Sequence, residues 1–256
     1  MLAAHRQMLV LQAISDAGAG RISELASTLR VSEMTVRRDI EALSVKGLVL
    51  KTHGGAIAAE TGSSATEPPF QIKSLREQTA KVAIARRAAE LVQPASSVAL
   101  MGGSTVYALA AHLVNTPQIT VVTNSLPVSN LFHQTGRSDQ TVILAGGMRT
   151  PTDSFVGEIT VSVFEKLNVD YAFMGAHGVD PRGGYTSPNL LESETNRSVR
   201  QHAKKLVVLA DHTKWGQIGF STFAGLADAH TLITDMGASA EIREVMESLI
   251  PEVLFT

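Results

Sequence analysis

Two adjacent arginines, Arg37 and Arg38, lie in a segment whose apolar residues recur with the spacing of a helix. Val36, Ile40 and Leu43 define the buried side of that helix, so both guanidinium groups are expected on its outer side or at its edges. Arginine binds phosphate oxygens and also pairs with the edge of guanine in the major groove. These residue types at this spacing therefore point to DNA binding.

A basic hairpin is predicted directly after this helix, with strands at residues 48–51 and 56–59 and a turn at 52–55. Lys51 and His53 can contact the DNA backbone as a wing does, and the turn glycines let the main chain approach closely. The alternative is an ordinary solvated helix followed by a hairpin. The complete arrangement of short helix, turn, polar-fronted helix and basic hairpin favours DNA binding. The predicted DNA-contacting residues are Ser32, Met34, Thr35, Arg37, Arg38, Lys51, His53 and Gly54.

A second group of polar residues follows a predicted strand that ends near Met101. Gly102 and Gly103 let backbone N–H groups approach an anion, and Ser104 and Thr105 add hydroxyl groups at the start of a helix. This turn is neither a P-loop nor a dinucleotide-binding turn, because it lacks the lysine of the first and the glycine spacing of the second. It can be a phosphate cradle, or only a tight connection between strand and helix.

Three further polar clusters follow later strands, at residues 123–124, 146–149 and 211–214. The carboxyl ends of parallel strands meet at one edge of a sheet, so the four clusters together predict a composite pocket. Arg149 and Lys214 can supply positive charge to a phosphate group. Local hydrogen bonds within the loop are an alternative role for residues 211–212. The eight histidines lack the spacing of metal ligands, and we predict neither a metal nor a cofactor.

Three helices are predicted to position the N-terminal residues. The first covers about His5–Ala17, and the second covers about Ser23–Leu29 with Ser23 as its N-cap. The third covers about Glu33–Lys46 and is ended by Gly47. These helices and the hairpin are the parts of a winged helix-turn-helix domain, which we place at residues 1–57.

The pattern of the rest of the chain predicts an α/β domain. Residues 58–71, rich in Ser, Thr and Pro, are expected to be a linker, and a basic amphipathic helix at about 72–92 opens a domain at 72–256. Strands and helices then alternate, which indicates a largely parallel sheet covered on both faces. The predicted strands are 98–101, 119–123, 141–145, 171–176, 206–210, 231–234 and 252–255, and the helices lie near 105–114, 125–134, 157–167, 189–202 and 239–249.

Composition narrows the class of protein. The 256 residues are 44% hydrophobic and 18% charged, as in a folded chain of one or two domains. The absence of cysteine excludes disulfides, thiolate metal sites and thiol catalysis. No apolar run reaches the ~18 residues of a membrane span, and the N-terminus lacks a secretory signal, so we expect a cytoplasmic protein with no membrane partner. The net charge is −2, but the first 59 residues carry +2.

The N-terminal segment resembles the signature of the DeoR/GlpR family of bacterial repressors. The family's recognition helix and wing match Ser32, Thr35, Arg37, Arg38, Asp39, Ile40, Leu43, Gly47, Val49, Lys51, His53, Gly54, Gly55 and Ala56. Asp39 follows the two arginines directly and is expected to orient one of them, in a structural role, instead of contacting DNA.

The resemblance extends over about residues 5–256, through "TNSLPV", "LAGGMR", "SFVGE", "GGYTSPNLLESE" and "LADHTKWG". The sensor region of these repressors is similar to ribose-phosphate isomerases and glucosamine-phosphate deaminases, which implies a Rossmann-like α/β fold and a phosphorylated sugar or related metabolite as effector. The effector-binding residues that the sequence and the resemblance predict are Gly102, Gly103, Ser104, Thr105, Thr123, Asn124, Gly146, Gly147, Arg149, Gly157, Glu192, Asp211 and Lys214.

Two departures from the family pattern bear on the effector. Met101 stands where many relatives carry an acidic residue, and Asn196 stands where relatives often have lysine. The effector therefore cannot be copied from any one relative. Asp211 and Glu192 keep a sugar-phosphate isomerase open as an alternative, because isomerisation needs a carboxylate or similar base. A binding module that contacts some other partner through the basic N-terminus is a third alternative.

The sequence as a whole predicts a transcriptional regulator and not an enzyme. We expect it to bind double-stranded operator DNA and to repress genes for a sugar or sugar derivative until a phosphorylated sugar releases it. One winged helix covers little DNA, so a homodimer or homotetramer is expected to present paired readers.

Overall fold

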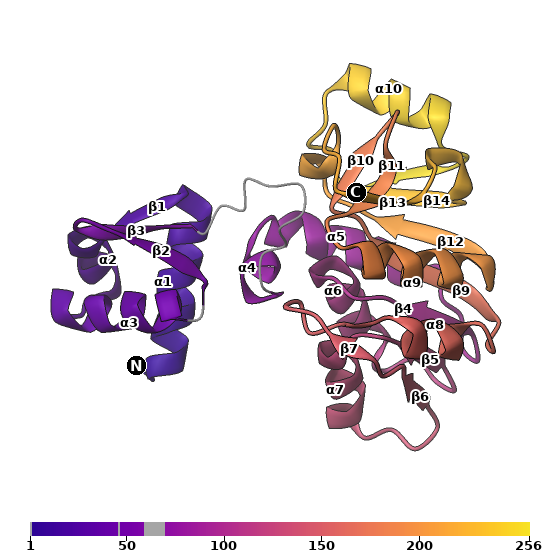
Figure 1. Cartoon of the computed structure of the whole chain (residues 1–256), viewed down its shortest axis with the longest axis horizontal. Coiled ribbons are helices and arrows are strands. Elements are labelled where there is room, and N and C mark those ends of the chain that lie inside the picture. Colours follow the sequence, from indigo (N-terminus) through magenta and orange to yellow (C-terminus); the bar gives the residue numbers. More distant parts are fainter. Residues whose placement is uncertain (1, 46, 59–69) are drawn as a thin grey trace. The chain divides into compact units, whose positions relative to one another are not determined.

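The structure of the chain is a computed structural model that describes residues 2–45, 47–58 and 70–256 (Figure 1). The chain forms two compact units. The first contains the elements up to residue 58 together with a short helix at residues 70–75, and the second runs from Glu77 to Thr256. The domain boundaries given by the sequence remain predictions, and residues 59–69 of the predicted linker lie outside the described residues. No helix within the described part of the chain is long and apolar enough to cross a membrane.

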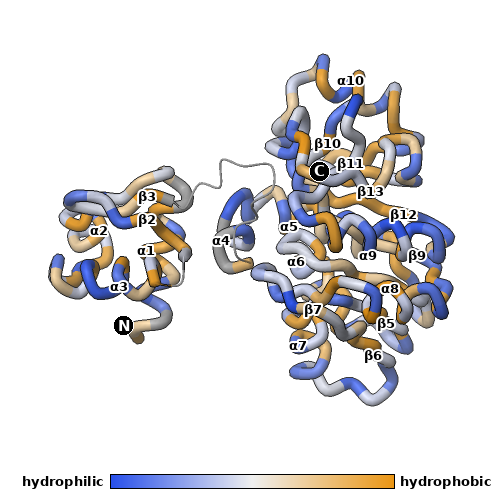
Figure 2. Tube along the Cα trace, in the orientation of Figure 1, coloured by the Kyte–Doolittle hydropathy of each residue, from blue (hydrophilic) through white to orange (hydrophobic). Residues whose placement is uncertain are grey.

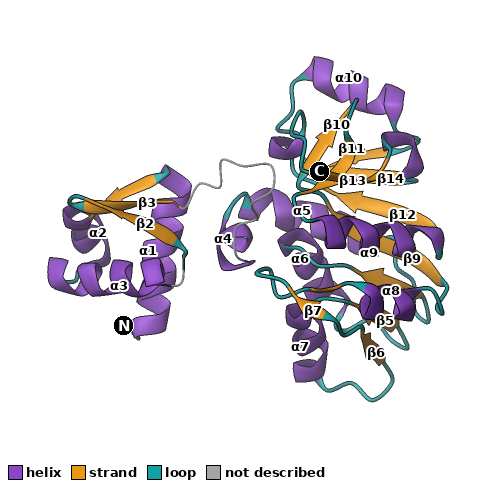
Figure 3. Cartoon of the chain, viewed as in Figure 1, coloured by secondary structure: helices purple, strands orange, loops and turns teal. Residues whose placement is uncertain are grey.

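The first unit contains helices packed beside a small antiparallel sheet in which β3 lies between β1 and β2 (Figures 1 and 3). The predicted helices and hairpin are confirmed, and β1 adds a strand that the sequence pattern did not indicate. Its elements are α1 (Ala3–Ala17), β1 (Ala19–Arg21), α2 (Ile22–Leu29), α3 (Glu33–Val45), β2 (Val49–Thr52) and β3 (Gly55–Ala58). Its core includes Val10, Ile14, Leu25, Val36, Ile40, Leu43 and Val49.

The ends of α3 follow from its flanking residues. The Ser32 hydroxyl accepts a hydrogen bond from the Thr35 backbone N–H at 3.2 Å, which satisfies one of the free donors of the first turn. Gly47 has a φ of +69° and donates its N–H to the Ser44 carbonyl, so it ends the helix as predicted. The predicted cap of α2 was wrong. The helix begins at Ile22, and Ser23 lies inside it, because Arg21 is still extended in β1.

The single helix predicted at about 72–92 is two helices, α4 (Phe70–Leu75) and α5 (Gln78–Ala89). The break occurs at Glu77, whose φ of +49° lies in the left-handed region and cannot continue a helix. α4 belongs to the first unit, where it contacts α1, and α5 belongs to the second.

The second unit is built on a seven-stranded sheet with the order β15-β14-β12-β9-β4-β5-β6. Every pairing in this sheet is parallel, so the predicted α/β class is confirmed. Each predicted strand is present, with ends that differ by a few residues. The strands are β4 (Ser97–Leu100), β5 (Thr120–Thr123), β6 (Thr141–Leu144), β9 (Val169–Gly175), β12 (Ala203–Leu209), β14 (Thr231–Thr234) and β15 (Val253–Phe255).

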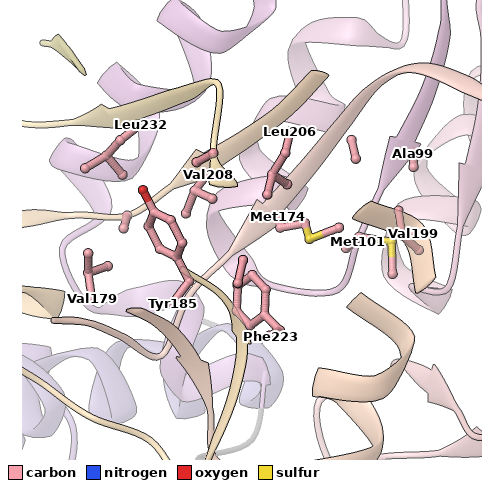
Figure 4. Packing of buried hydrophobic residues seen from close by; sticks show 14 of the residues in the cluster. Ala99, Met101, Met174, Val179, Tyr185, Val199, Leu206, Val208, Phe223 and Leu232 are labelled. Atoms are coloured by element: carbon pink, nitrogen blue, oxygen red, sulfur yellow. The ribbon is translucent and has the colours of Figure 1, made fainter. Parts of the chain in front are cut away.

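Alternate residues of each strand enter two separate cores, one on each face of the sheet. Leu100 and Phe173 pack with residues of α5, α6 (Ser104–Leu113) and α7 (Leu126–Thr135). Met101 and Met174 pack on the other face, with residues of α8 (Glu158–Phe164), α9 (Leu190–Gln201) and α10 (Ala240–Leu249). Figure 4 shows this second core around Tyr185 and Phe223. Figure 2 shows hydrophobic residues along the strands and hydrophilic ones on outer helices such as α9.

Short antiparallel strands, which the sequence did not predict, lie outside the main sheet. β7 (Met148–Arg149) and β8 (Phe155–Val156) pair into a small arm that follows β6. β10 (Gly178–Asp180), β11 (Gly184–Ser187) and β13 (Ser221–Ala224) form a three-stranded sheet. Two short 3₁₀ turns, η1 (His212–Lys214) and η2 (Leu226–Asp228), flank β13 in the chain.

Candidate functional site

α3 presents both predicted arginines to solvent. Arg37 and Arg38 are exposed, and neither forms a hydrogen bond or ion pair with a residue that the structure describes. The opposite side of α3 is buried through Val36, Ile40 and Leu43, as predicted. The two guanidinium groups are therefore accessible to phosphate oxygens or base edges.

Ser32 and Thr35 are partly committed to the helix that carries them. Their hydroxyl groups lie 2.9 Å apart and hydrogen-bond to each other, in addition to the cap that Ser32 provides. Ser32 remains exposed and Thr35 is half-buried. The hydrogen bonds that the structure shows give these two residues a role at the start of α3. A contact between either hydroxyl group and a DNA phosphate would be formed in addition to these bonds.

Asp39 does not orient Arg37 or Arg38, contrary to the prediction. Its carboxylate is 2% exposed and accepts two hydrogen bonds from Arg6 of α1, at 2.5 and 3.1 Å. A third donor, the amide of Gln7, lies 3.4 Å away. The wrong expectation came from sequence adjacency. Asp39 follows the arginines in the chain, but it points to the buried side of α3. It fixes the recognition helix against α1 and stays structural.

The wing is present, but its lysine is paired. Lys51 on β2 forms an ion pair with Glu41 of α3, with nitrogen–oxygen distances of 2.7 and 2.9 Å. A phosphate at Lys51 would have to compete with this carboxylate. His53 and Gly54 are exposed in the turn, and the φ of +88° at Gly54 is one that glycine adopts readily. Gly55 has no room for a side chain, because its Cβ would lie 2.3 Å from the Gly20 carbonyl oxygen.

In the second unit, the order of strands reverses between β4 and β9. β5 and β6 extend the sheet on one side of β4, and β9, β12, β14 and β15 extend it on the other. Connections that diverge in this way leave a crevice beyond the carboxyl ends of the two strands, where α/β proteins bind ligands. The predicted effector residues Gly102–Thr105 directly follow β4 and therefore lie at this position.

The turn after β4 joins two glycines to the start of α6, the arrangement that the predicted anion cradle requires. Gly103 has a φ of +141° and precedes α6, which begins without a side-chain cap. Ser104 and Thr105 are buried in the first turn of α6. Gly102 is required by its surroundings, because a Cβ there would lie 2.0 Å from the Ser154 hydroxyl oxygen. That hydroxyl is buried and has no hydrogen-bond partner among the described residues.

Thr123 and Asn124, at the end of β5, form hydrogen bonds that connect the end of β4 and the turn after it to β8. The Asn124 side chain accepts from the Gly102 N–H at 2.9 Å and donates to the Phe155 carbonyl at 2.8 Å. The Thr123 hydroxyl donates to the Leu100 carbonyl at 2.5 Å. Both residues are buried, and these bonds hold the turn after β4 against the strand β8. They position the candidate pocket, and direct contact with an effector remains a prediction.

The arm after β6 uses its glycines for packing. The Gly146 carbonyl accepts from the Thr160 hydroxyl at 2.8 Å, and a Cβ on Gly147 would lie 2.2 Å from that same hydroxyl oxygen. Gly157 has a φ of +96° immediately before α8. Arg149 is 57% exposed and pairs with Asp153 through contacts of 2.6 and 2.9 Å. A phosphate at Arg149 would therefore compete with a carboxylate, as at Lys51.

Two carboxylates follow β11 and β12. Glu192, in the first turn of α9, accepts hydrogen bonds from the Ser187 hydroxyl at 2.8 Å and the Thr152 hydroxyl at 3.3 Å. Asp211 is 2% exposed, and its Oδ1 accepts from the backbone and hydroxyl of Thr213. The Oδ2 atom of Asp211 accepts no hydrogen bond from a described residue, but it forms a long ion pair of 3.9 Å with the Lys214 ammonium.

Hydrogen bonding within the loop, the alternative role, describes Asp211 and not the neighbouring histidine, which bonds outside its own loop. His212 bonds to Asp235 through its ring at 2.7 Å and through its backbone N–H at 2.7 Å. No group of three or more His, Asp or Glu side chains in the described ranges is arranged to hold a metal ion. The loop therefore offers one carboxylate oxygen with unused acceptor capacity and one nearby lysine.

His177 follows β9 on the other side of the strand reversal and was not among the predicted effector residues. Its N–H donates to the Thr186 carbonyl at 2.9 Å. Like the predicted clusters, it is a polar residue shortly after a buried strand, with only Ala176 between it and the end of β9. A cavity of about 360 Å³ lies at the opposite, amino end of the sheet, where Ala95, Asp170 and Lys204 line it. It includes none of the predicted effector residues.

Comparison with known proteins gives matches over both units. The DeoR-like helix-turn-helix domain matches residues 6–62, and the DeoR C-terminal sensor domain matches residues 76–236. YgbI, an uncharacterised HTH-type transcriptional regulator of Escherichia coli (strain K12), is 32% identical over 93% of this chain and 91% of its own length. A lactose phosphotransferase system repressor of Staphylococcus epidermidis (strain ATCC 35984) is 32% identical over 94% of this chain and 95% of its own. A solved D-ribose-5-phosphate isomerase in complex with phospho-erythronic acid has a TM-score of 0.41 and 17% identity, over 54% of each chain.

Proposed function

Because the chain belongs to the DeoR family of transcriptional regulators, we propose that it represses genes for the uptake or breakdown of a sugar or sugar derivative and is released by a phosphorylated sugar. The observation that carries the DNA-binding half is the pair Arg37 and Arg38, exposed on a helix whose other side is packed. The name of the S. epidermidis relative supports the sugar half. The proposal places the chain in the cytoplasm, where it reaches operator DNA.

The effector pocket is proposed at the carboxyl ends of β4, β9 and β12. Its donors are the first turn of α6 and the cations Arg149 and Lys214, which suit the phosphate end of a ligand. Its acceptors are Glu192 and the Oδ2 atom of Asp211, which suit hydroxyl groups. A molecule with a phosphate at one end and hydroxyls along its length, as in a sugar phosphate, satisfies both sets.

Self-association belongs to the proposal. One α3 buries little DNA surface, and specific recognition requires several kcal/mol more than one small contact supplies. A homodimer or homotetramer would present two recognition helices to repeated half-sites. The effector would then act by favouring an arrangement of the readers that does not fit the operator.

The regulator is favoured over the isomerase-like alternative, because the matched family consists of transcription regulators with a DNA-binding domain. A reporter gene placed behind the chain's own upstream region tests the proposal. Expression of the full chain should lower reporter output, and the double substitution R37A/R38A should restore it. Unchanged output with the wild-type chain would contradict repression, whereas higher output would indicate activation.

A further inference from the structure

Met34 occupies a distinctive place on the recognition helix. It is 59% exposed, in the first turn of α3. The spacing of 3.6 residues per turn puts Met34, Arg38, Glu41 and Val45 along one outward line, opposite the buried Leu43. An apolar side chain therefore stands on the line that enters the groove if α3 reads DNA.

The neighbours of Met34 have other tasks. The Thr35 hydroxyl is bonded to Ser32 at 2.9 Å, and Thr35 is half-buried, so it does not lie on the outward line. Glu41, one turn after Arg38, is paired with Lys51. Apart from Glu33, whose carboxylate a phosphate would repel, the exposed side chains left without a described partner near the start of α3 are thus one flexible thioether and two guanidinium groups.

These two kinds of group match different features of a base pair. Arginine binds phosphates or the acceptors of guanine, and apolar side chains contact the 5-methyl group of thymine in the major groove. Methionine is unbranched and polarisable, so it can settle against such a methyl group. The early residues of a recognition helix are those that reach base edges.

We propose that Met34 determines operator specificity by packing on the 5-methyl group of a thymine in each half-site. The inference rests on the proposed entry of α3 into the major groove. It gives Met34, one of the residues predicted to contact DNA, a specific role at the base edge. Arg37 and Arg38 then supply the phosphate or guanine contacts on either side.

Replacing thymine by uracil tests the proposal, because this removes only the methyl group and leaves base pairing intact. Duplexes are first selected from a random pool by the full-length chain, and each thymine of the selected site is then replaced in turn. Dissociation constants are measured by fluorescence anisotropy for the wild type, M34A and V45A. Val45 is the matched control, since it is 81% exposed at the other end of the same line.

Uracil in place of the contacted thymine of a single half-site should weaken wild-type binding about fourfold, the value of one buried methyl group. M34A should bind the thymine duplex more weakly and show no further loss with uracil, while V45A should behave as the wild type. Loss of less than about twofold at every position in the wild type, or an undiminished loss in M34A, would overturn the inference. Failure to select any sequence would overturn the DNA-reading premise itself, a result distinct from the first two.

Discussion

Arg37 and Arg38 differ from Arg6 and Lys51, the paired cations of the first unit, in having no described partner. Arg6 is bound to Asp39 and Lys51 to Glu41, so those charges are already compensated inside the protein. An uncompensated guanidinium can give its full charge to a phosphate or base edge, whereas a paired cation must first break a contact.

Substitution of either arginine by alanine should weaken DNA binding by about 1–3 kcal/mol, and should lower the salt dependence where the lost contact was to a phosphate. Anisotropy titrations at several salt concentrations measure both effects. Effector binding, followed through the fluorescence of Trp215 beside Lys214, should not change. A large loss of effector binding would contradict the division of labour between the two units.

At Asp211 the unused Oδ2 atom leads to a second prediction. D211N keeps the size of the side chain but removes the charge, and should weaken effector binding by about 1.5–3 kcal/mol, as expected for a hydrogen bond to a charged group. K214A should also weaken it. K204A, at the other end of the sheet, is the control and should bind effector normally. If both D211N and K214A released DNA at the same effector concentration as the wild type, the pocket would lie elsewhere.

Residue types were easier to predict than side-chain directions. The sequence identified Thr123, Asn124 and Asp39 as polar residues near functional segments, but each is buried in bonds to another element. Those partners lie 23, 22 and 33 positions away in the chain, so no local pattern could reveal them.

At the scale of elements, the ion pair between Arg6 and Asp39 joins α1 to α3. Removing the charge of Asp39 leaves the Arg6 guanidinium uncompensated. D39N should therefore lower the opening free energy of the α3 amides, which hydrogen exchange measures. D39N should weaken DNA binding only in proportion to the fraction of molecules in which α3 is open. Unchanged exchange with lost DNA binding would show that Asp39 contacts DNA itself.

A second tie joins β4 to β9 at their amino ends, where Asp170 bonds to Lys204 and to the backbone and hydroxyl of Ser97. These bonds lower the pKa of Asp170 from 3.8 to about 2. The folded carboxylate holds its proton less tightly than the unfolded one, so its stabilising effect is full above about pH 4 and is lost as the pH falls towards 2.

The melting temperatures of the wild type and D170N should therefore differ at pH 5 and converge by about pH 2. K204A removes the largest cause of the lowered Asp170 pKa. Its melting temperature should therefore depend on pH less than that of the wild type over this range, as that of D170N does. A difference between wild type and D170N that stays constant over this pH range would contradict the assignment.

Long apolar strands were predictable, and short polar ones were not. β9 and β12 bury continuous runs of apolar residues and were found from the sequence. β7 and β8 have two residues each, and their pairing depends on the arm that Asn124 holds in place. The break at Glu77 was missed because glutamate normally favours helix and nothing in its neighbourhood indicates a positive φ.

For the molecule as a whole, the proposal joins a DNA reader to a sensor of a phosphorylated sugar. The family assignment establishes a transcriptional regulator. Coupling between the two units requires that the effector bind one arrangement of the readers more tightly than another, since a ligand with equal affinity for both would shift nothing.

One experiment tests this coupling directly. A labelled duplex from the chain's own upstream region is titrated with full-length protein at about 50 and about 200 mM salt, with sugar phosphates and with the matching unphosphorylated sugars. We predict salt-sensitive binding that one sugar phosphate abolishes and its parent sugar leaves intact. Specific binding that no sugar phosphate changes, or release by the parent sugar alone, would contradict the proposed effector control.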